Sequence, residues 1–164
     1  MKKIAVIFPG VGYNKDRPLL YYSGKLAAKN GYELRFIDFS GIKWSKEQLK
    51  DMGDMSGDDV LFISKSIGTV VATAYAEKMS INAGQICFSP LEMIEGFVKE
   101  EGAELFCGDN DPMADYKVLE RIAKEKRLKI HRIEGGNHSL ETGDIFKDID
   151  NLRSVLHDIA VLFI

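Results

Sequence analysis

The residues Val60-Leu61-Phe62-Ile63-Ser64-Lys65-Ser66-Ile67-Gly68 join a short apolar run to a stretch rich in small side chains. The apolar run predicts a buried strand, and the small residues after it favour a closely packed helix. A serine at such a junction fits the pattern G-x-S-x-G, in which a sharp turn exposes a nucleophilic hydroxyl. Gly68 matches the last glycine of this pattern, whereas Ser64 replaces the first. An ordinary helix N-cap is the alternative role for Ser66, and this stretch alone leaves both roles open.

Strand-like and helix-like segments alternate along the whole chain. Strands are predicted at 3–8, 32–38, 59–64, 84–88, 103–107 and 128–133. Helices are predicted at 17–30, 45–52, 67–79, 90–98, 112–126 and 144–163. This alternation predicts a three-layer α/β/α domain over residues 1–164, with about six mainly parallel strands between two helical layers. In the last helix, apolar residues from Phe146 to Phe163 recur at helical spacing and predict one face packed on the core.

The composition of the strands predicts their order. Runs around Val6, Leu61 and Ile86 are apolar without alternation, as expected for central strands. Residues 32–36 and 128–133 interleave charged and apolar side chains, which is typical of edge strands. A doubly wound order of 2-1-3-4-5-6 satisfies both observations, and its winding reverses between the first and third strands. Ligands bind at such a reversal, outside the carboxyl ends of the strands, so Ser66 lies at the predicted crevice.

Bulk composition excludes several classes of partner. The chain has 164 residues, 45% of them hydrophobic, which suits one domain with a sizeable core. The net charge of −3 and a pI of about 5.7 give no cationic surface for nucleic acid or acidic membranes. The apolar run Ile4–Phe8 is too short for a secretory signal, and we expect a cytoplasmic protein. Cys87 and Cys107 fall in predicted buried strands and are interpreted as reduced core residues.

Two loops that follow later strands carry a candidate acid and a candidate base. Asp111 follows the fifth strand and is placed to accept a hydrogen bond from an imidazole. An N-cap with Pro112 at the first helical position is its alternative role, and local sequence does not separate the two. Asp109 is the second candidate for the acid. His138 lies in the glycine-flanked loop 134–141 after the sixth strand, at the same edge of the sheet as Ser66.

These residue types suit nucleophilic catalysis. A serine hydroxyl is unreactive at neutral pH until a neighbouring base takes its proton. Imidazole is such a base, and a carboxylate on its other nitrogen fixes its tautomer. Backbone N–H groups of Ile67 and of Val11 or Gly12 are candidates for an oxyanion hole. The alternative for the first glycine loop is a tight turn or a weak phosphate-binding loop, although the full G-x-G-x-x-G spacing is missing.

The chain resembles the α/β-hydrolase family over nearly its whole length. The resemblance rests on Pro9-Gly10-Val11-Gly12, on Ser66-Ile67-Gly68, on Gly108 with Asp111, and on Gly135-Gly136-Asn137-His138. By this likeness Ser66 is the nucleophile, Asp111 the acid and His138 the base. The resemblance implies a minimal α/β-hydrolase in which only residues 89–102 stand where larger relatives insert a lid.

The implied activity is that of a serine hydrolase acting on a small carboxylic ester or thioester through an acyl-enzyme. No metal or organic cofactor is implied, and the expected partner is a small-molecule acyl substrate. A non-catalytic or flavodoxin-like binding protein that uses the same crevice is the alternative. Lys65, beside the nucleophile, is expected to point into solvent, and attraction of an anionic substrate is its less favoured role.

Overall fold

A computed structural model describes residues 1–38, 49 and 52–164, so the helix expected at 45–52 lies almost wholly outside the described residues. Six parallel strands form one sheet in the order β2-β1-β3-β4-β5-β6. The strands are β1 (Lys3–Phe8), β2 (Glu33–Phe36), β3 (Asp59–Lys65), β4 (Ala83–Phe88), β5 (Ala103–Gly108) and β6 (Lys129–Ile133). The predicted strand order is therefore confirmed.

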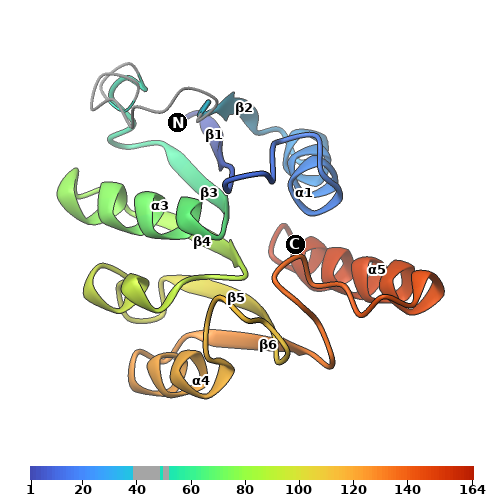
Figure 1. Cartoon of the computed structure of the whole chain (residues 1–164). Coiled ribbons are helices and arrows are strands. Elements are labelled where there is room, and N and C mark those ends of the chain that lie inside the picture. Colours follow the sequence, from blue (N-terminus) through green and yellow to red (C-terminus); the bar gives the residue numbers. More distant parts are fainter. Residues whose placement is uncertain (39–48, 50–51) are drawn as a thin grey trace.

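Helices cover both faces of this sheet, which confirms the predicted three layers (Figure 1). They are α1 (Pro18–Lys29), α3 (Ile67–Lys78), the 3-10 helix η1 (Glu92–Gly96), α4 (Tyr116–Glu125) and α5 (Ile145–Val161). Helices α1 and α5 pack together on one face, and α3, η1 and α4 lie on the other (Figure 1). No helix in the described ranges has both the length and the apolar character needed to cross a membrane.

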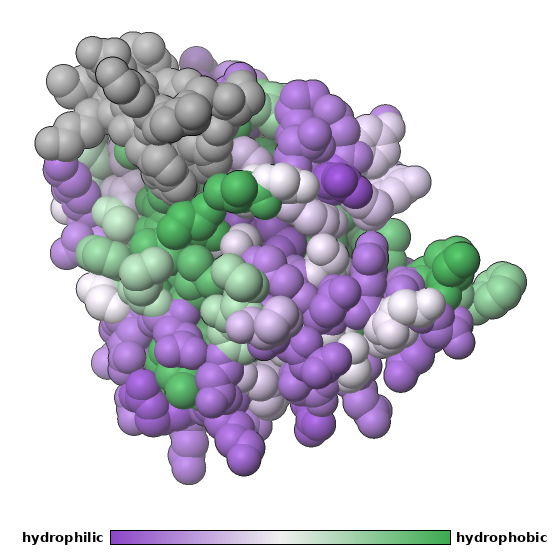
Figure 2. All heavy atoms as spheres, in the orientation of Figure 1, coloured by the Kyte–Doolittle hydropathy of each residue, from purple (hydrophilic) through white to green (hydrophobic). Residues whose placement is uncertain are grey.

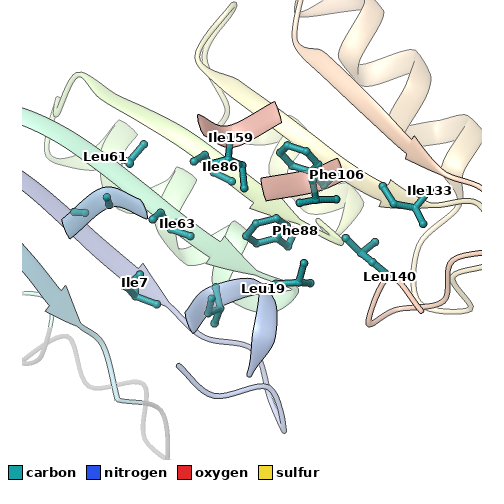
Figure 3. Packing of buried hydrophobic residues seen from close by; sticks show 14 residues of the cluster. Ile7, Leu19, Leu61, Ile63, Ile86, Phe88, Phe106, Ile133, Leu140 and Ile159 are labelled. Atoms are coloured by element: carbon teal, nitrogen blue, oxygen red, sulfur yellow. The ribbon is translucent and has the colours of Figure 1, made fainter. Parts of the chain in front are cut away.

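The face under α1 and α5 holds a continuous apolar core. Side chains from five strands and both helices meet there, and Leu140 from the loop after β6 joins them (Figure 3). Leu140 is 5% exposed, so this loop is anchored in the core by an apolar side chain. The edge strand β2 has only half-buried and exposed side chains, whereas β3 is buried along nearly its whole length. This contrast matches the expected difference between edge and central strands.

Two predicted helices differ from the observed ones. The segment 90–98 forms only η1, because Pro90 and Gly96 bound a run too short to sustain an α-helix. Helix α4 begins at Tyr116 rather than near residue 112, since the Asp115 side chain caps it by accepting a hydrogen bond from the Lys117 amide. The alternative role of Asp111 as an N-cap of this helix is therefore wrong, and that carboxylate has other partners.

Helix α5 packs on the core by only part of its length. Val155 and Ile159 are buried, but Phe146 is 82% exposed and Ile149 is 57% exposed. Figure 2 shows hydrophobic surface at the end of α5 where the helix begins. The prediction of one continuous core-facing stripe from Phe146 to Phe163 is therefore wrong for the first turns, which extend beyond the sheet (Figure 1).

Candidate active site

Ser66 stands at the sharp turn between β3 and α3 in a backbone conformation that is rare for a residue with a side chain. Its φ is 55° and its ψ is −124°, close to the first central position of a type II′ turn. Its amide donates to the Phe88 carbonyl oxygen at 2.9 Å. Its side chain makes no capping hydrogen bond to α3, so the hydroxyl is not used as an N-cap. The turn instead presents this hydroxyl at the carboxyl edge of the sheet.

Close packing of backbone explains the residue types around this turn. A Cβ atom on Gly68 would lie 2.5 Å from the carbonyl oxygens of Phe8 and Pro9, so α3 starts against the end of β1 only because position 68 is glycine. Ser64, which replaces the first glycine of the motif, is fully buried in β3. Its hydroxyl donates to the Ile86 carbonyl oxygen at 3.2 Å, so the extra polar atom is satisfied.

His138 connects Ser66 to Asp111 through two short hydrogen bonds. Its Nε2 lies 2.7 Å from Ser66 Oγ, and its Nδ1 lies 2.7 Å from Asp111 Oδ2. An ionised carboxylate can only accept, so Nδ1 carries the proton and Nε2 is left to accept from the serine hydroxyl. The Asp111 side chain is 4% exposed and the His138 side chain 26% exposed. The acid is therefore enclosed, while the base retains access to solvent at the edge of the site.

The two candidate acids have different positions. Asp111 places one carboxylate oxygen on His138, and its other oxygen accepts from the Met113 amide at 2.8 Å. Asp109 instead accepts from the Gly135 amide at 2.6 Å and from Arg132 Nε at 2.8 Å. The Arg132 side chain, with that amide, lowers the pKa of Asp109. Asp111 therefore contacts the imidazole of His138, whereas Asp109 binds the backbone of the loop that carries His138.

Two glycines set the spacing between the acid loop and the histidine loop. A Cβ atom on Gly108 would lie 2.1 Å from the Gly136 carbonyl oxygen, and one on Gly136 would lie 3.2 Å from Gly108 Cα. The two backbones are thus in direct contact at this point. Any side chain at Gly108 would push the loops apart, and with them the carboxylate and the imidazole.

The loop after β1 lies beside Ser66. A Cβ on Gly10 would lie 3.2 Å from Ser66 Cβ, which places this loop directly beside the serine. The Gly10 amide is engaged with the Tyr13 carbonyl oxygen. Within the described residues, no hydrogen bond occupies the amides of Val11, Gly12 or Ile67. These are the three amides that the sequence predicts for an oxyanion hole, and they stay candidates for that role.

Lys65 is the residue whose position the sequence prediction missed. It was expected in solvent, but it is 1% exposed and lies under the histidine loop. Its Nζ donates to the His138 backbone carbonyl oxygen and lies 5.0 Å from the centre of the Tyr13 ring. Strand alternation could have found this, because Lys65 follows Ile63 by two residues and so shares its core-facing side. An expectation based on charge alone was wrong here.

The remaining histidines and cysteines lie away from this constellation. His131, in β6, stacks on Phe106 and contacts Glu104 at 2.8 Å. Cys87 and Cys107 are buried free thiols, and burial raises the pKa of Cys87 to about 12. Across the described ranges, no group of three or more histidine, cysteine or acidic side chains is arranged to hold a metal ion.

Comparison by sequence finds no relative: no protein-family model matches the chain, and no curated protein matches it. Comparison by structure finds several. A protein of unknown function from Agrobacterium tumefaciens, ATU1826, described as a putative α/β hydrolase, is 15% identical with a TM-score of 0.73, over 96% of this chain and 84% of that one. Est1E from Butyrivibrio proteoclasticus is 13% identical with a TM-score of 0.74, over 98% and 86% of the two chains.

XC6422 from Xanthomonas campestris, described as a member of the α/β serine hydrolases without a lid, gives a TM-score of 0.72 at 14% identity. The alignment covers 98% of this chain and 82% of that one. These similarities extend over nearly the whole chain, and they agree with the strand order and with the placement of the helices. At such low identity they establish the architecture. The chain therefore has the α/β-hydrolase fold.

Proposed function

We propose that the protein is a serine hydrolase that cleaves a small carboxylic ester or thioester through an acyl-enzyme. The observation that carries this proposal is the unbroken chain of hydrogen bonds from Ser66 through His138 to Asp111, with both links at 2.7 Å. The strained turn that holds Ser66 supports the same assignment, because backbone strain of this kind concentrates at functional sites.

Acylation follows from the proposed roles. Ser66 Oγ attacks the acyl carbon while Nε2 of His138 takes the hydroxyl proton, and the carbonyl oxygen becomes an oxyanion. Amides of Ile67 and of Val11 or Gly12 donate to that oxyanion. The bond to the leaving oxygen or sulfur then breaks, and the leaving group takes the proton from the imidazolium. The products of this step are an acyl-serine and a neutral alcohol or thiol.

Deacylation repeats these steps with water. His138 takes a proton from a water molecule, whose oxygen attacks the acyl carbon, and the same amides hold the second oxyanion. The bond to Ser66 Oγ breaks, the serine regains its proton from the imidazolium, and the carboxylic acid leaves. Asp111 stays ionised throughout and stabilises the imidazolium in both halves of the reaction.

A small or exposed acyl group is the substrate that we infer. The connection from β4 to β5 contains only the five-residue helix η1, so little chain is present there to enclose a long acyl tail. Two structural neighbours support this choice. XC6422 is described as a serine hydrolase without a lid, and Est1E has been solved with ferulic acid bound.

A fluorophosphonate probe tests the proposal directly, because it reacts with a serine only when a base activates it. We expect labelling of Ser66 in the wild-type protein and none in Ser66→Ala. Hydrolysis of p-nitrophenyl acetate should fall by at least about 10³-fold in that variant, as is usual when one member of a triad is removed. Ser154→Ala, which changes an exposed serine on α5, is the matched control and should keep full activity.

The opposite result is equally clear. A wild-type protein that is folded yet unlabelled, with no turnover of an acetyl, a hydroxycinnamoyl or a thioester substrate, would favour a non-catalytic binding protein. A yellow protein as purified would favour the flavodoxin-like alternative.

A further inference from the structure

A lysine occupies a core position at the edge of the candidate active site. Lys65 is the last residue of β3, pairs with Phe88 of β4, and is 1% exposed. Its strand position gives it the same side of the sheet as Ile63, whose side chain belongs to the core under α1 and α5 (Figure 3). A buried ammonium is unfavourable unless it is hydrogen-bonded, so its partners indicate why it is there.

The polar partner of Lys65 is the backbone of the candidate base itself. Its Nζ donates to the His138 carbonyl oxygen at 2.5 Å. Ser89, at the end of β4, donates to the same oxygen through Oγ at 2.8 Å. Both lone pairs of this one carbonyl are therefore engaged by side chains from two adjacent strands. A hydrogen bond from an ionised donor is roughly twice as strong as one between neutral groups, so the lysine is the stronger of the two anchors.

These contacts matter because they hold the His138 peptide itself, between two parts of the loop that have other anchors. Before the histidine, Asp109 accepts from the Gly135 amide and the Gly136 backbone touches Gly108. After the histidine, the amides of Ser139 and Glu141 donate back to the Asn137 side chain, and Leu140 is buried in the core (Figure 3). The peptide of His138 lies between these regions and is held to the sheet by Lys65.

The charge of Lys65 is sensitive to mildly alkaline pH. Burial lowers its pKa to about 8, and the Asp111 carboxylate partly opposes this shift. Two titratable side chains act on the lysine in the described part of the chain: Asp111 from the loop after β5, through its charge, and Tyr13 from the loop after β1, whose ring centre lies 5.0 Å from Nζ. Burial raises the pKa of Tyr13 to about 12, so this phenol stays neutral through the alkaline range.

We propose that Lys65 is a positioning residue for the catalytic base. It holds the His138 backbone so that the imidazole stays aligned between Ser66 and Asp111, and loss of its proton at alkaline pH weakens this hold. The proposal rests on the proposed function, since it assigns to Lys65 the control of the same triad. It differs from the attraction of an anionic substrate, because a lysine buried to this extent does not reach a ligand.

The test is the pH profile of kcat for p-nitrophenyl acetate between pH 7 and 9.5, corrected for spontaneous hydrolysis. In the wild-type protein we expect kcat to fall by about three- to tenfold with a midpoint near pH 8. Lys65→Gln keeps a neutral donor, so its profile should be flat and close to the alkaline plateau of the wild type. Lys65→Met removes the donor and should be flat at a lower value.

Ser89→Ala is the matched control, because it removes the other donor to the same oxygen and adds or removes no titratable group. Its kcat should be lower than that of the wild type, while the fall near pH 8 should remain. Near-ultraviolet circular dichroism checks that each variant keeps its packing. If Lys65→Met does not fold, the comparison of Lys65→Gln with Ser89→Ala still tests the proposal.

Three results would overturn this role for the lysine: a wild-type kcat in both Lys65 variants, an alkaline fall that persists in them, or loss of that fall in Ser89→Ala. Fluorophosphonate labelling separates this failure from failure of the proposed function. If Ser66 is labelled in the wild-type protein but the Lys65 variants behave as the wild type does, only the positioning role is lost. If Ser66 is not labelled at all, the hydrolase assignment is lost as well.

Discussion

Replacing Ser66 by glycine should make the protein more stable than replacing it by alanine. Both changes remove the hydroxyl and its hydrogen bond to His138, so the difference between them isolates the backbone. A residue with a Cβ at φ 55° and ψ −124° carries strain of about 1–3 kcal/mol, which glycine does not have. This strain is the consequence of holding a side chain at a type II′ turn position.

The net magnitude follows from two opposing terms. Glycine loses more conformational freedom on folding than alanine does, which offsets about 0.5–1 kcal/mol of the relieved strain. We therefore expect Ser66→Gly to exceed Ser66→Ala by about 1 kcal/mol in the free energy of unfolding. For a chain of this length that difference raises the midpoint of thermal unfolding by about 2–4 °C.

Urea titration and calorimetry of the two variants measure this difference. The pair Ser154→Gly and Ser154→Ala is the control, because Ser154 is exposed within helix α5 and has no positive φ. There the order should reverse, with the glycine variant less stable by about 1 kcal/mol. If Ser66→Gly is equal to or less stable than Ser66→Ala, the turn is not strained and this reasoning fails.

Other expectations follow from the same site and its surroundings. Asp111→Asn should lower kcat for ester hydrolysis by about 10⁴-fold, because an amide no longer selects the required imidazole tautomer. Asp109→Asn should change kcat by less than about tenfold. Equal losses in the two variants would mean that the acid is misassigned. Gly68→Ala should lower the free energy of unfolding, measured in urea, by about 1–3 kcal/mol, and it should slow fluorophosphonate labelling. The reason is that the alanine Cβ would lie 2.5 Å from two carbonyl oxygens. A variant with the wild-type stability and labelling rate would contradict that packing. Phe146→Ser should leave stability within about 0.5 kcal/mol, because this side chain is 82% exposed, and a larger loss would indicate that it is covered in solution.

The sheet could be predicted because its strands differ in composition. The central strand β3 has an uninterrupted apolar run, Val60–Ile63, whereas the edge strand β6 interleaves charged and apolar residues. The predicted strand order placed Ser66 at the reversal of winding, and the loops of Asp111 and His138 follow on the same edge. The sequence therefore predicts that the three side chains lie at one place, and it favours Asp111 while keeping Asp109 as the second candidate, because both lie in one short loop.

Other features depend on tertiary packing that local sequence does not contain. Lys65 looks like a surface residue by type, yet the histidine loop folds over it and its ammonium finds a backbone carbonyl there. The first turns of α5 continue the apolar spacing of the helix, but they extend beyond the sheet that they would cover. For Lys65 and for the first turns of α5, local sequence shows whether the side chains are charged or apolar. It does not show which part of the folded chain lies against them.

The contact between Gly108 and Gly136 has a consequence for how this protein can diverge. The closest approach of the acid loop and the histidine loop is set where two stretches of main chain touch, and it requires the absence of a side chain at Gly108. A substitution elsewhere leaves this main-chain contact in place as long as both positions keep hydrogen as their side chain. Mutational tolerance should accordingly fall sharply at these two glycines, as at Gly68, although none of the three carries a reactive group.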